Sequence, residues 1–400
     1  MVSHCNSQGS CVYACSLDAE GAFDNIPHAV LFMRAMNIIP DPCWKILVNW
    51  YSNLRVQVKW NNRLSDSVSI RIGTRQGGLT SPFLFNIFYQ GMIERLNDKH
   101  CGINMYGFNL NVCCYADDIL LLSLSPSGLQ DLIYCANSYI RDHGLRFNPV
   151  KTQCIVLGKS RLQYEPQWTL CDTKLEIHDN IKYLGVVLSN NNDDHVQSRI
   201  QACRKAFYCL QGAGLCKRGA SVKVVLQLWN TILRPILLYG THCIKLTQKS
   251  LKDLESTQAK LLKAALCLSK ICRTTPLIDA FHVPSVARSI EINRLNLLRS
   301  AMNTDSIGSE YLSHIVGDHI MNIAIDHNNL IHQCIGICNN HELSHINCMM
   351  DGQYLKRAKK QMNSKSSHVP NGMADTVNYL LSTSQLDNRH LLVNLLLRPF

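Results

Sequence analysis

The chain has 400 residues, of which 46% are hydrophobic and 17% charged, so it can bury a sizeable core and fold as two or three subdomains. No stretch approaches the roughly 20 uncharged apolar residues that span a bilayer, and the N-terminus lacks a signal-peptide pattern. Nineteen cysteines are scattered through apolar stretches, unlike those of small disulfide-rich domains. We therefore expect reduced, mostly buried thiols and an intracellular protein, cytoplasmic or nuclear, that is not secreted and has no membrane partner.

The net charge of +11 is concentrated in one part of the sequence. Residues 195–275 contain fourteen Lys or Arg and two acids, so this segment carries +12 while the rest is close to neutral. A localised basic surface suits a phosphate backbone, whose affinity comes from displacing condensed counterions. Taken alone, the charge fits a solvated basic helical face equally well.

The first half alternates strand-length apolar runs with amphipathic stretches, which predicts a mixed α and β fold. The expected elements, in chain order, are a buried strand over 12–17 ending at Asp18, a helix over 27–36, strands over 55–60 and 67–72 joined through Asn61 and Asn62, a helix over 83–96, and a tight hairpin of strands over 112–115 and 119–122. From about residue 195 the pattern is helical, and the polar run 189–194 predicts a domain boundary near 190.

The tip of the second predicted hairpin carries two adjacent carboxylates, Asp117 and Asp118. Like charges at such close range destabilise each other unless a cation neutralises them. Asp18 also ends an apolar strand, and a third carboxylate beside the pair would complete the oxygen-rich site that Mg²⁺ prefers. Two such ions can activate an attacking hydroxyl and stabilise the leaving oxygen in phosphoryl transfer. For the Asp pair alone, an exposed polar turn is the alternative interpretation.

Five segments resemble, in order and spacing, the palm motifs of reverse transcriptases. They are Leu17–Asp24 (motif A), Gly73–Pro82 (motif B), Tyr115–Asp118 (motif C), Gly144–Thr152 (motif D) and Tyr183–Gly185 (motif E, the primer grip). Four segments resemble in particular the enzymes of non-LTR, LINE-type retrotransposons: residues 22–28, 75–77, 181–185 and the downstream segment 233–240.

The resemblance implies an RNA-directed DNA polymerase with an α+β fold, in which a right-hand palm of antiparallel sheet and packed helices precedes an α-helical thumb. The palm would cover residues 1–190 and the basic thumb residues 191–305, while residues 306–400 would be helical or irregular with an unclear role. The partners implied are an RNA template, a DNA primer and deoxynucleoside triphosphates. The placement of the basic segment in the thumb favours nucleic-acid binding over a merely solvated face.

The resemblance also implies catalytic roles for matching residues. Asp18, Asp117 and Asp118 would bind two Mg²⁺ ions, with Mn²⁺ as a substitute. Lys151 would act as general acid toward the leaving pyrophosphate, although a lone Lys in a loop is usually just solvated.

Nucleotide and primer contacts follow from the same motifs. Phe23 would exclude a 2′-hydroxyl, although without the motif it would be interpreted as a core aromatic. Gln76 and Gly77 would lie along the incoming nucleotide, where glycine permits close approach of the backbone. Arg75 would reach a phosphate, with an ordinary surface arginine as the alternative. The primer terminus would be supported by Tyr183, Leu184 and Gly185.

The sequence departs from the family pattern ahead of motif A. Only 17 residues precede Asp18, so we expect the family's fingers motifs to be largely missing and the chain to resemble a fragment of a retrotransposon protein. A truncated, catalytically inactive remnant that only binds nucleic acid is therefore the alternative function.

A cluster of Cys and His residues lies near the C-terminal end: Cys334, Cys338, His341, His345 and Cys348. Its spacing matches a zinc knuckle poorly, and Cys334 and Cys338 fit one buried helical face equally well.

Overall fold

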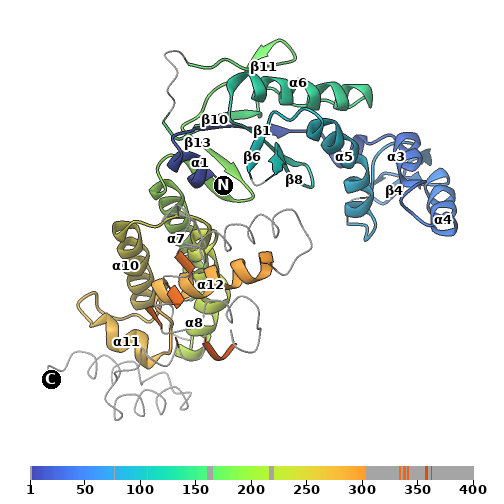
Figure 1. Ribbon diagram of the computed structural model, residues 1–400. Coiled ribbons are helices and arrows are strands. Elements are labelled where there is room, and N and C mark those ends of the chain that lie inside the picture. Colours follow the sequence, from blue (N-terminus) through green and yellow to red (C-terminus); the bar gives the residue numbers. More distant parts are fainter. Residues whose placement is uncertain are drawn as a thin grey trace. The chain divides into compact units, whose positions relative to one another are not determined.

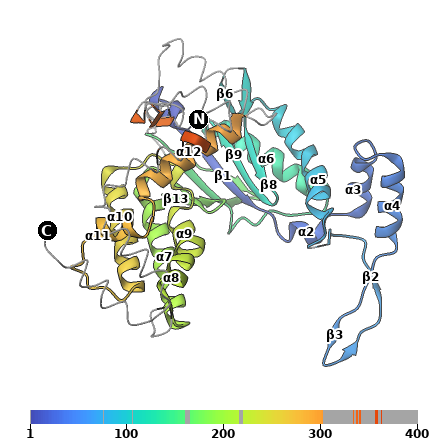
Figure 2. The same ribbon diagram turned by 90° about the horizontal axis from the view of Figure 1, so that it is seen from below.

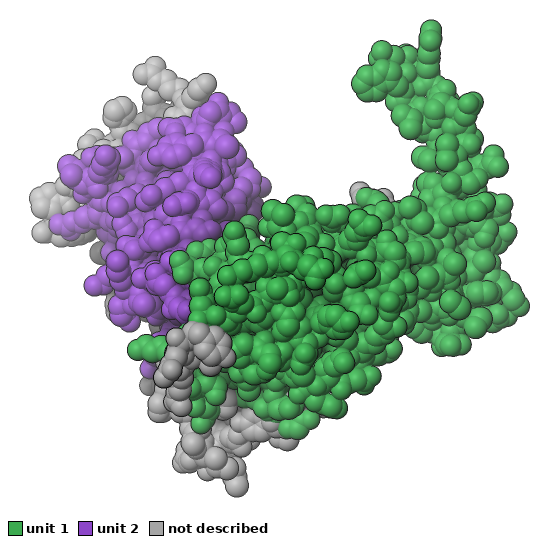
Figure 3. Space-filling view, turned by 90° about the horizontal axis from the view of Figure 1, so that it is seen from above, with its two compact units in different colours: residues 1–184 green, residues 185–400 purple. Residues whose placement is uncertain are grey.

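The computed structural model describes residues 2–75, 77–105, 107–159, 165–215 and 220–302, with a few positions between 333 and 362. Gln76, His345 and Cys348 lie outside the described residues, as does most of the range 306–400. The chain divides into two compact units, residues 1–184 and 185–400 (Figure 3). The assignment of palm, thumb and C-terminal region to 1–190, 191–305 and 306–400 stays a prediction.

A four-stranded antiparallel sheet of order β10-β1-β9-β8 forms the centre of unit 1 (Figure 1). Its strands are β1 (Val12–Asp18), β8 (Val112–Tyr115), β9 (Asp118–Ser123) and β10 (Gln153–Leu157). The predicted apolar run over 12–17 becomes an inner strand because its side chains are buried on both faces of the sheet. The mixed helix-and-sheet fold class is thereby confirmed.

Two long helices, α5 (Ser81–Asn97) and α6 (Pro126–Asp142), pack on each other, and α6 packs on the sheet at β1 and β9 (Figure 2). Proline occupies the first turn of each helix, where its missing N–H leaves no hydrogen bond unmade. The Ser125 side chain caps α6 by accepting a hydrogen bond from the Gly128 N–H. The helix predicted over 83–96 is therefore confirmed as α5.

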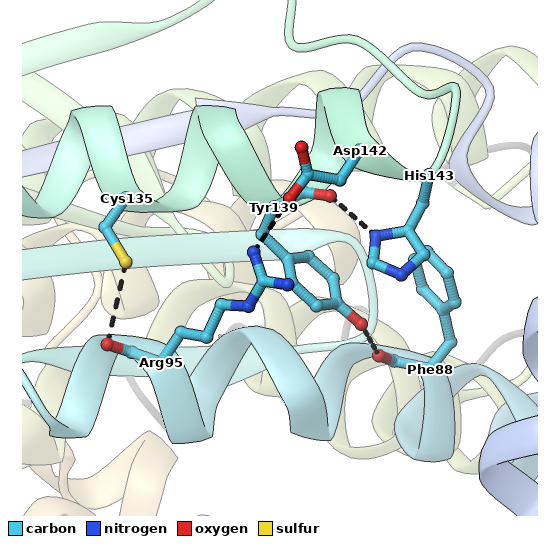
Figure 4. Close-up of polar contacts among 6 residues, drawn as sticks. All are labelled: Phe88, Arg95, Cys135, Tyr139, Asp142 and His143. Atoms are coloured by element: carbon cyan, nitrogen blue, oxygen red, sulfur yellow. Dashed lines mark hydrogen bonds and ion pairs between the residues drawn. The ribbon is translucent and has the colours of Figure 1, made fainter.

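Polar contacts around Tyr139 hold α5 and α6 together (Figure 4). The Tyr139 hydroxyl donates to the Phe88 carbonyl at 2.6 Å, and burial raises the pKa of Tyr139 to about 12. Arg95 pairs with Asp142 at 2.8 Å, with its guanidinium 5.1 Å from the centre of the Tyr139 ring. His143 donates from Nδ1 to the Tyr139 carbonyl at 2.7 Å. These contacts fix the end of α6, from which the motif D segment departs.

The segment between β1 and α5 contains short helices and a β-ribbon. The helices are α2 (Ala22–Asn25), α3 (His28–Ala35) and α4 (Asp41–Ser52), and α1 (Val2–Ser7) precedes them. In the ribbon, β2 (Arg55–Val56) pairs with β5 (Val68–Ser69), and β3 (Lys59–Trp60) pairs with β4 (Arg63–Leu64). The ribbon extends away from the rest of unit 1 (Figure 2).

The predicted hairpin turn of this ribbon is confirmed. Asn61 and Asn62 both have positive φ, 44° and 59°, as a two-residue type I′ turn requires. The prediction of two continuous strands is wrong, because each is interrupted. Unit 1 also contains the short strands β6 (Ile103–Met105), β7 (Phe108–Leu110), β11 (Thr169–Leu170), β12 (Thr173–Lys174) and β13 (Asn180–Tyr183).

The part of unit 2 that the structure describes is mainly helical, as the sequence predicts from about residue 195. It contains β14 (Val186–Ser189), α7 (Asp193–Gly212), α8 (Val222–Leu228), a π-helical turn (Trp229–Leu233), α9 (Arg234–Leu238), a 3₁₀ turn (Thr241–Cys243), α10 (Gln248–Ala265), α11 (Thr274–Ala280) and α12 (Val286–Met302). Its core is built around fully buried side chains such as Trp229, Leu237 and Leu254.

None of the helices in the described ranges is long and apolar enough to cross a membrane. Of the described cysteines, eight are buried and five exposed, so the prediction of mostly buried thiols is correct for only about half of them. Cys334 and Cys338 are both buried. No group of three or more potential ligands among the described residues could hold zinc there, and because His345 and Cys348 lie outside those residues, zinc binding stays untested.

Candidate functional site

Strand pairing brings the three aspartates of motifs A and C to one end of the central sheet. In the register of β1 and β9, Asp18 lies directly opposite Asp118. The pairing of Tyr115 with Asp118 leaves Ala116 and Asp117 as a two-residue turn, in which Ala116 has φ 54°. A positive φ at the first turn residue matches the right-handed twist of a hairpin. The predicted meeting of the three carboxylates is therefore built into the sheet register.

The electrostatics of the site follow from this placement. Partial burial raises the pKa of Asp118 above its ordinary value, and the negative charges of Asp117 and Asp18 raise it further. The three side chains nevertheless do not form a closed ligand set, because no group of three or more His, Cys, Asp or Glu in the described ranges is arranged to hold a metal ion. The Asp117 and Asp118 side chains are exposed and that of Asp18 is 42% exposed, so all three have room to change rotamer.

Lys151 lies beside the first aspartate. Its ammonium Nζ is 3.5 Å from a carboxylate oxygen of Asp18, and both side chains are largely exposed, so the ion pair contributes at most about 1 kcal/mol to stability. The loop is fixed from its backbone: the Asn148 N–H donates to the Asp18 carbonyl at 2.8 Å, and the Asn148 side chain accepts from the N–H groups of Val150 and Lys151. The sequence analysis gave Asn148 no role, although Asn before Pro is a recognisable turn signal.

Phe23 stands at the end of an aromatic stack. Its ring is partly buried and stacks on Phe85 of α5, with centroids 4.2 Å apart, and Phe85 stacks on Tyr89 at 4.5 Å. The buried Tyr89 hydroxyl has no hydrogen-bond partner among the described residues, and burial together with the Asp117 charge raises its pKa. Phe23 is thus both a core contact and a partly accessible ring.

Backbone hydrogen bonds join the motif A and motif B segments. The Thr74 N–H donates to the Phe23 carbonyl and the Gly73 N–H to the Ile26 carbonyl, each at 2.7 Å. His28 Nε2 donates to the Gly73 carbonyl at 2.8 Å. Gly73 has φ 85°, and a Cβ there would lie 2.7 Å from a backbone oxygen, so this position requires glycine. His28 and Thr74 are positioning residues for which the sequence analysis predicted no role.

The following motif B residues are exposed. The Arg75 guanidinium lies 5.7 Å from the centre of the Trp50 ring, and the Arg75 carbonyl accepts hydrogen bonds from the Gly78 N–H and the Ser81 hydroxyl. Gly77 has φ 78°, and a Cβ there would meet nothing within 4 Å. Gln76, between them, lies outside the described residues.

The motif E segment contacts the motif C strand. The Tyr183 hydroxyl donates to the Cys113 carbonyl of β8 at 3.0 Å, and burial raises the pKa of Tyr183. Leu184 and Gly185 follow with φ 47° and 77°, a conformation that costs a non-glycine residue strain. The structure therefore brings Tyr183 to the strand that leads into Asp117 and Asp118.

Comparison with known proteins shows which family the chain is similar to. Residues 2–188 match the family model described as "Reverse transcriptase (RNA-dependent DNA polymerase)". Curated relatives include the Pol polyprotein of the type-1 retrotransposable element R2 of Popillia japonica, 30% identical over 44% of this chain, and the RNA-directed DNA polymerase of the mobile element jockey of Drosophila funebris, 20% identical over 69% of this chain. The predicted resemblance to non-LTR retrotransposon enzymes is confirmed.

The chain spans only part of these relatives, 30% of the R2 polyprotein and 31% of the jockey polymerase. Among solved structures, the chain is similar to telomerase of Candida tropicalis in complex with a TWJ fragment of telomeric RNA. The aligned region covers 93% of this chain and 49% of the telomerase chain, with 11% sequence identity and a TM-score of 0.39.

Proposed function

We propose that this chain supplies the catalytic part of an RNA-directed DNA polymerase, which transfers nucleotides from deoxynucleoside triphosphates to a primer 3′-hydroxyl on an RNA template. The observation that carries the proposal is the register of the central sheet, which sets Asp18 opposite Asp118 and puts Asp117 in the adjoining turn. In this assignment unit 1 contains the palm and unit 2 contains the basic thumb.

The donor set of the site fits divalent metal ions. Asp18, Asp117 and Asp118 would hold two Mg²⁺ or Mn²⁺ ions, which activate the primer hydroxyl and stabilise the leaving oxygen when bound. In support, partial burial and the negative charges of Asp117 and Asp18 raise the pKa of Asp118, so a cation would relieve this repulsion. These carboxylates are not arranged as a ligand set in the described residues, so binding a cation would require a change of their rotamers, and at Asp18 the cation would compete with Lys151.

Lys151 then has a defined task. The Lys151 ammonium, which lies 3.5 Å from the Asp18 carboxylate, would donate a proton to the leaving pyrophosphate. Phe23 would pack under the nucleotide sugar and exclude a 2′-hydroxyl, with Phe85 holding it from behind. The exposed Arg75–Gly77 segment would follow the nucleotide, and Tyr183–Gly185 would support the primer terminus.

A second candidate is a nucleic-acid binder without chemistry. The observation in its favour is that the carboxylates do not form a metal-ligand set in the described structure. This alternative predicts salt-dependent binding of RNA and DNA that does not change when Asp117 is replaced.

Primer extension distinguishes the two. Purified protein is incubated with a labelled DNA primer on an RNA template, deoxynucleotides and Mg²⁺, and compared with Asp117→Asn and with Asp131→Asn, which changes an exposed aspartate of α6. Extension by wild type and Asp131→Asn, but not by Asp117→Asn, supports the polymerase. Folded wild-type protein that binds the primer–template and extends nothing establishes the binder.

A further inference from the structure

Two glycine turns far apart in the sequence interlock in unit 2. Gly185 has φ 77°, and a Cβ there would lie 3.0 Å from Cε1 of the Tyr239 ring. Gly240 has φ 72°, and a Cβ there would lie 2.9 Å from both the Val186 methyl and the His195 ring. A methyl group at Gly240 would force its neighbours to shift, and one at Gly185 would require the Tyr239 ring to move slightly, so each turn fits closely against the other's neighbour.

Hydrogen bonds made by the His195 ring connect the two turns. Its ring is buried, and Nδ1 accepts a hydrogen bond from the Val187 N–H at 3.2 Å while Nε2 donates to the Tyr239 carbonyl at 2.8 Å. Only the neutral tautomer with a proton on Nε2 makes both bonds. Burial also lowers the pKa of His195, which maintains that neutral form at physiological pH. The backbone of Tyr239 is therefore fixed to the strand that begins immediately after Gly185.

The backbone of Tyr239 is held by the hydrogen bond from His195, but its side chain is partly exposed to solvent. It is 49% exposed, and the Arg199 guanidinium of α7 lies 5.8 Å from its ring centre. Arg199 is half-buried, and no ion pair with an acid is recorded for it in the described ranges. Its Nε is buried without a hydrogen-bond partner among those residues, and its Nη2 donates one long hydrogen bond, 3.4 Å, to the Ser198 hydroxyl. Its positive charge therefore faces the aromatic ring and no described acid.

An aromatic ring backed by an uncompensated guanidinium suits the sugar–phosphate backbone of a nucleic-acid strand. The ring can pack on a sugar or base, and the guanidinium can contact a phosphate. The surrounding segment 195–275 carries +12, which disfavours a cationic or acid-poor protein partner and favours a polyanion.

We propose that Tyr239 and Arg199 form a single contact site for the sugar–phosphate backbone of a bound nucleic-acid strand, set in place by the close fit of Gly185 and Gly240 and by His195. The inference rests on the proposed function for the identity of the strand. The contact itself concerns unit 2 alone and predicts backbone binding whether or not the chain catalyses extension.

The test measures binding without chemistry. A fluorescent DNA primer annealed to an RNA template with a recessed 3′ end is titrated with protein at several salt concentrations, using anisotropy. Arg199→Ala is expected to weaken binding roughly tenfold and to reduce the slope of log K against log salt by about 0.7–0.9, the contribution of one phosphate contact. Arg199→Lys is expected to keep most of the slope because it keeps the charge.

Four further variants test the coupling between the two residues and serve as controls. Tyr239→Ala is expected to weaken binding. The double variant Tyr239→Ala/Arg199→Ala is expected to have about the same affinity as whichever single variant binds more weakly, because the two substitutions remove the same contact. Tyr239→Phe keeps the ring and is expected to bind within about twofold of wild type, which covers the case in which Tyr239→Ala fails to fold. Lys45→Ala removes a charge already paired with Asp41 and serves as the control for net charge.

An unchanged affinity and slope for Arg199→Ala overturns the inference, as does an equal slope change for Lys45→Ala. Additive losses in the double variant also overturn the single-contact assignment. If wild type extends no primer while the Arg199 effect is present, the polymerase proposal fails and this contact stands. If extension is normal and the slope is unchanged, only this contact fails.

Discussion

Replacing Asp118 by Asn is expected to stabilise the metal-free protein while removing its proposed chemistry. Asp118 lies directly opposite Asp18 on the neighbouring strand and follows Asp117 in the chain. Like charges directly opposite each other in a sheet cost about 0.2–1 kcal/mol. Asp18 is partly neutralised by Lys151, and Asp118 is exposed, so the gain for Asp118→Asn lies within that range and raises the Tm of unit 1 by at most about 4 °C.

The difference in stability between Asp118→Asn and wild type is expected to increase with pH. The pKa of Asp118 is raised in the folded state, so the folded state binds protons more tightly than the unfolded state. Stability from this group is complete below the ordinary aspartate pKa of 3.8 and is lost as pH rises through the raised folded-state value. Wild type and Asp118→Asn should therefore converge in stability near pH 3.8 and below, and differ fully at neutral pH.

Thermal unfolding with a chelator, followed by circular dichroism between pH 3 and 8, measures the effect, with Asp131→Asn as the matched control. Adding Mg²⁺ should stabilise wild type and reverse the order of the two proteins, because a ligand that binds only the folded state raises its stability. The reasoning is refuted if Asp118→Asn is no more stable than wild type at pH 7 without metal. Equal stabilisation of both by Mg²⁺ refutes the assignment of Asp118 as a ligand.

Three further changes have definite expected results. Phe23→Ala removes the ring stacked on Phe85 and should raise the kcat/KM ratio of ribonucleotides to deoxynucleotides in extension assays, whereas an unchanged ratio would remove Phe23 as the sugar filter. Gly240→Ala should destabilise unit 2 by about 1–3 kcal/mol in denaturant unfolding because of its positive φ and close neighbours, while Gly212→Ala, with open space around it, should not. In the β-ribbon, Trp60→Ser, which replaces a side chain 76% exposed, should lower self-association measured by light scattering without lowering Tm.

Much of the local structure could be predicted because it depends on neighbouring residues. The apolar spacing and Pro82 predict α5, and the residue types at Asn61 and Asn62 predict their positive φ. The interruption of the ribbon strands could not be predicted from alternation. From Arg55 to Lys59 there are four steps, but from their partners Ser69 to Leu64 there are five, so one strand contains an extra residue, as in a β-bulge.

The site was predicted through motifs, and the contacts between motifs were not. Periodicity assigns an element to a face, but it does not say which distant segment covers that face. The ion pair of Lys151 with Asp18 and the stacking of Phe85 under Phe23 depend on how the segments pack in three dimensions. The packing of Tyr239 on Gly185 is of the same kind, because 54 positions separate them along the chain and no turn signal links them.

The carboxylate site combines a rigid backbone with unfavourable side-chain placement, and this combination is what a metal-dependent polymerase requires. The residues of β1 from Val12 to Cys15 are at most 3% exposed, so the strand that delivers Asp18 is fixed by apolar burial. At its end, Asp18 faces Asp118, and Tyr89 leaves its buried hydroxyl without a partner among the described residues. Sequences break the rules of charge pairing and polar satisfaction mainly where function demands it. Apolar residues at these positions would stabilise the fold better than the Asp18 and Asp118 carboxylates and the Tyr89 hydroxyl do. The presence of these three groups at one end of the sheet therefore supports the proposed site for a cation and a nucleotide.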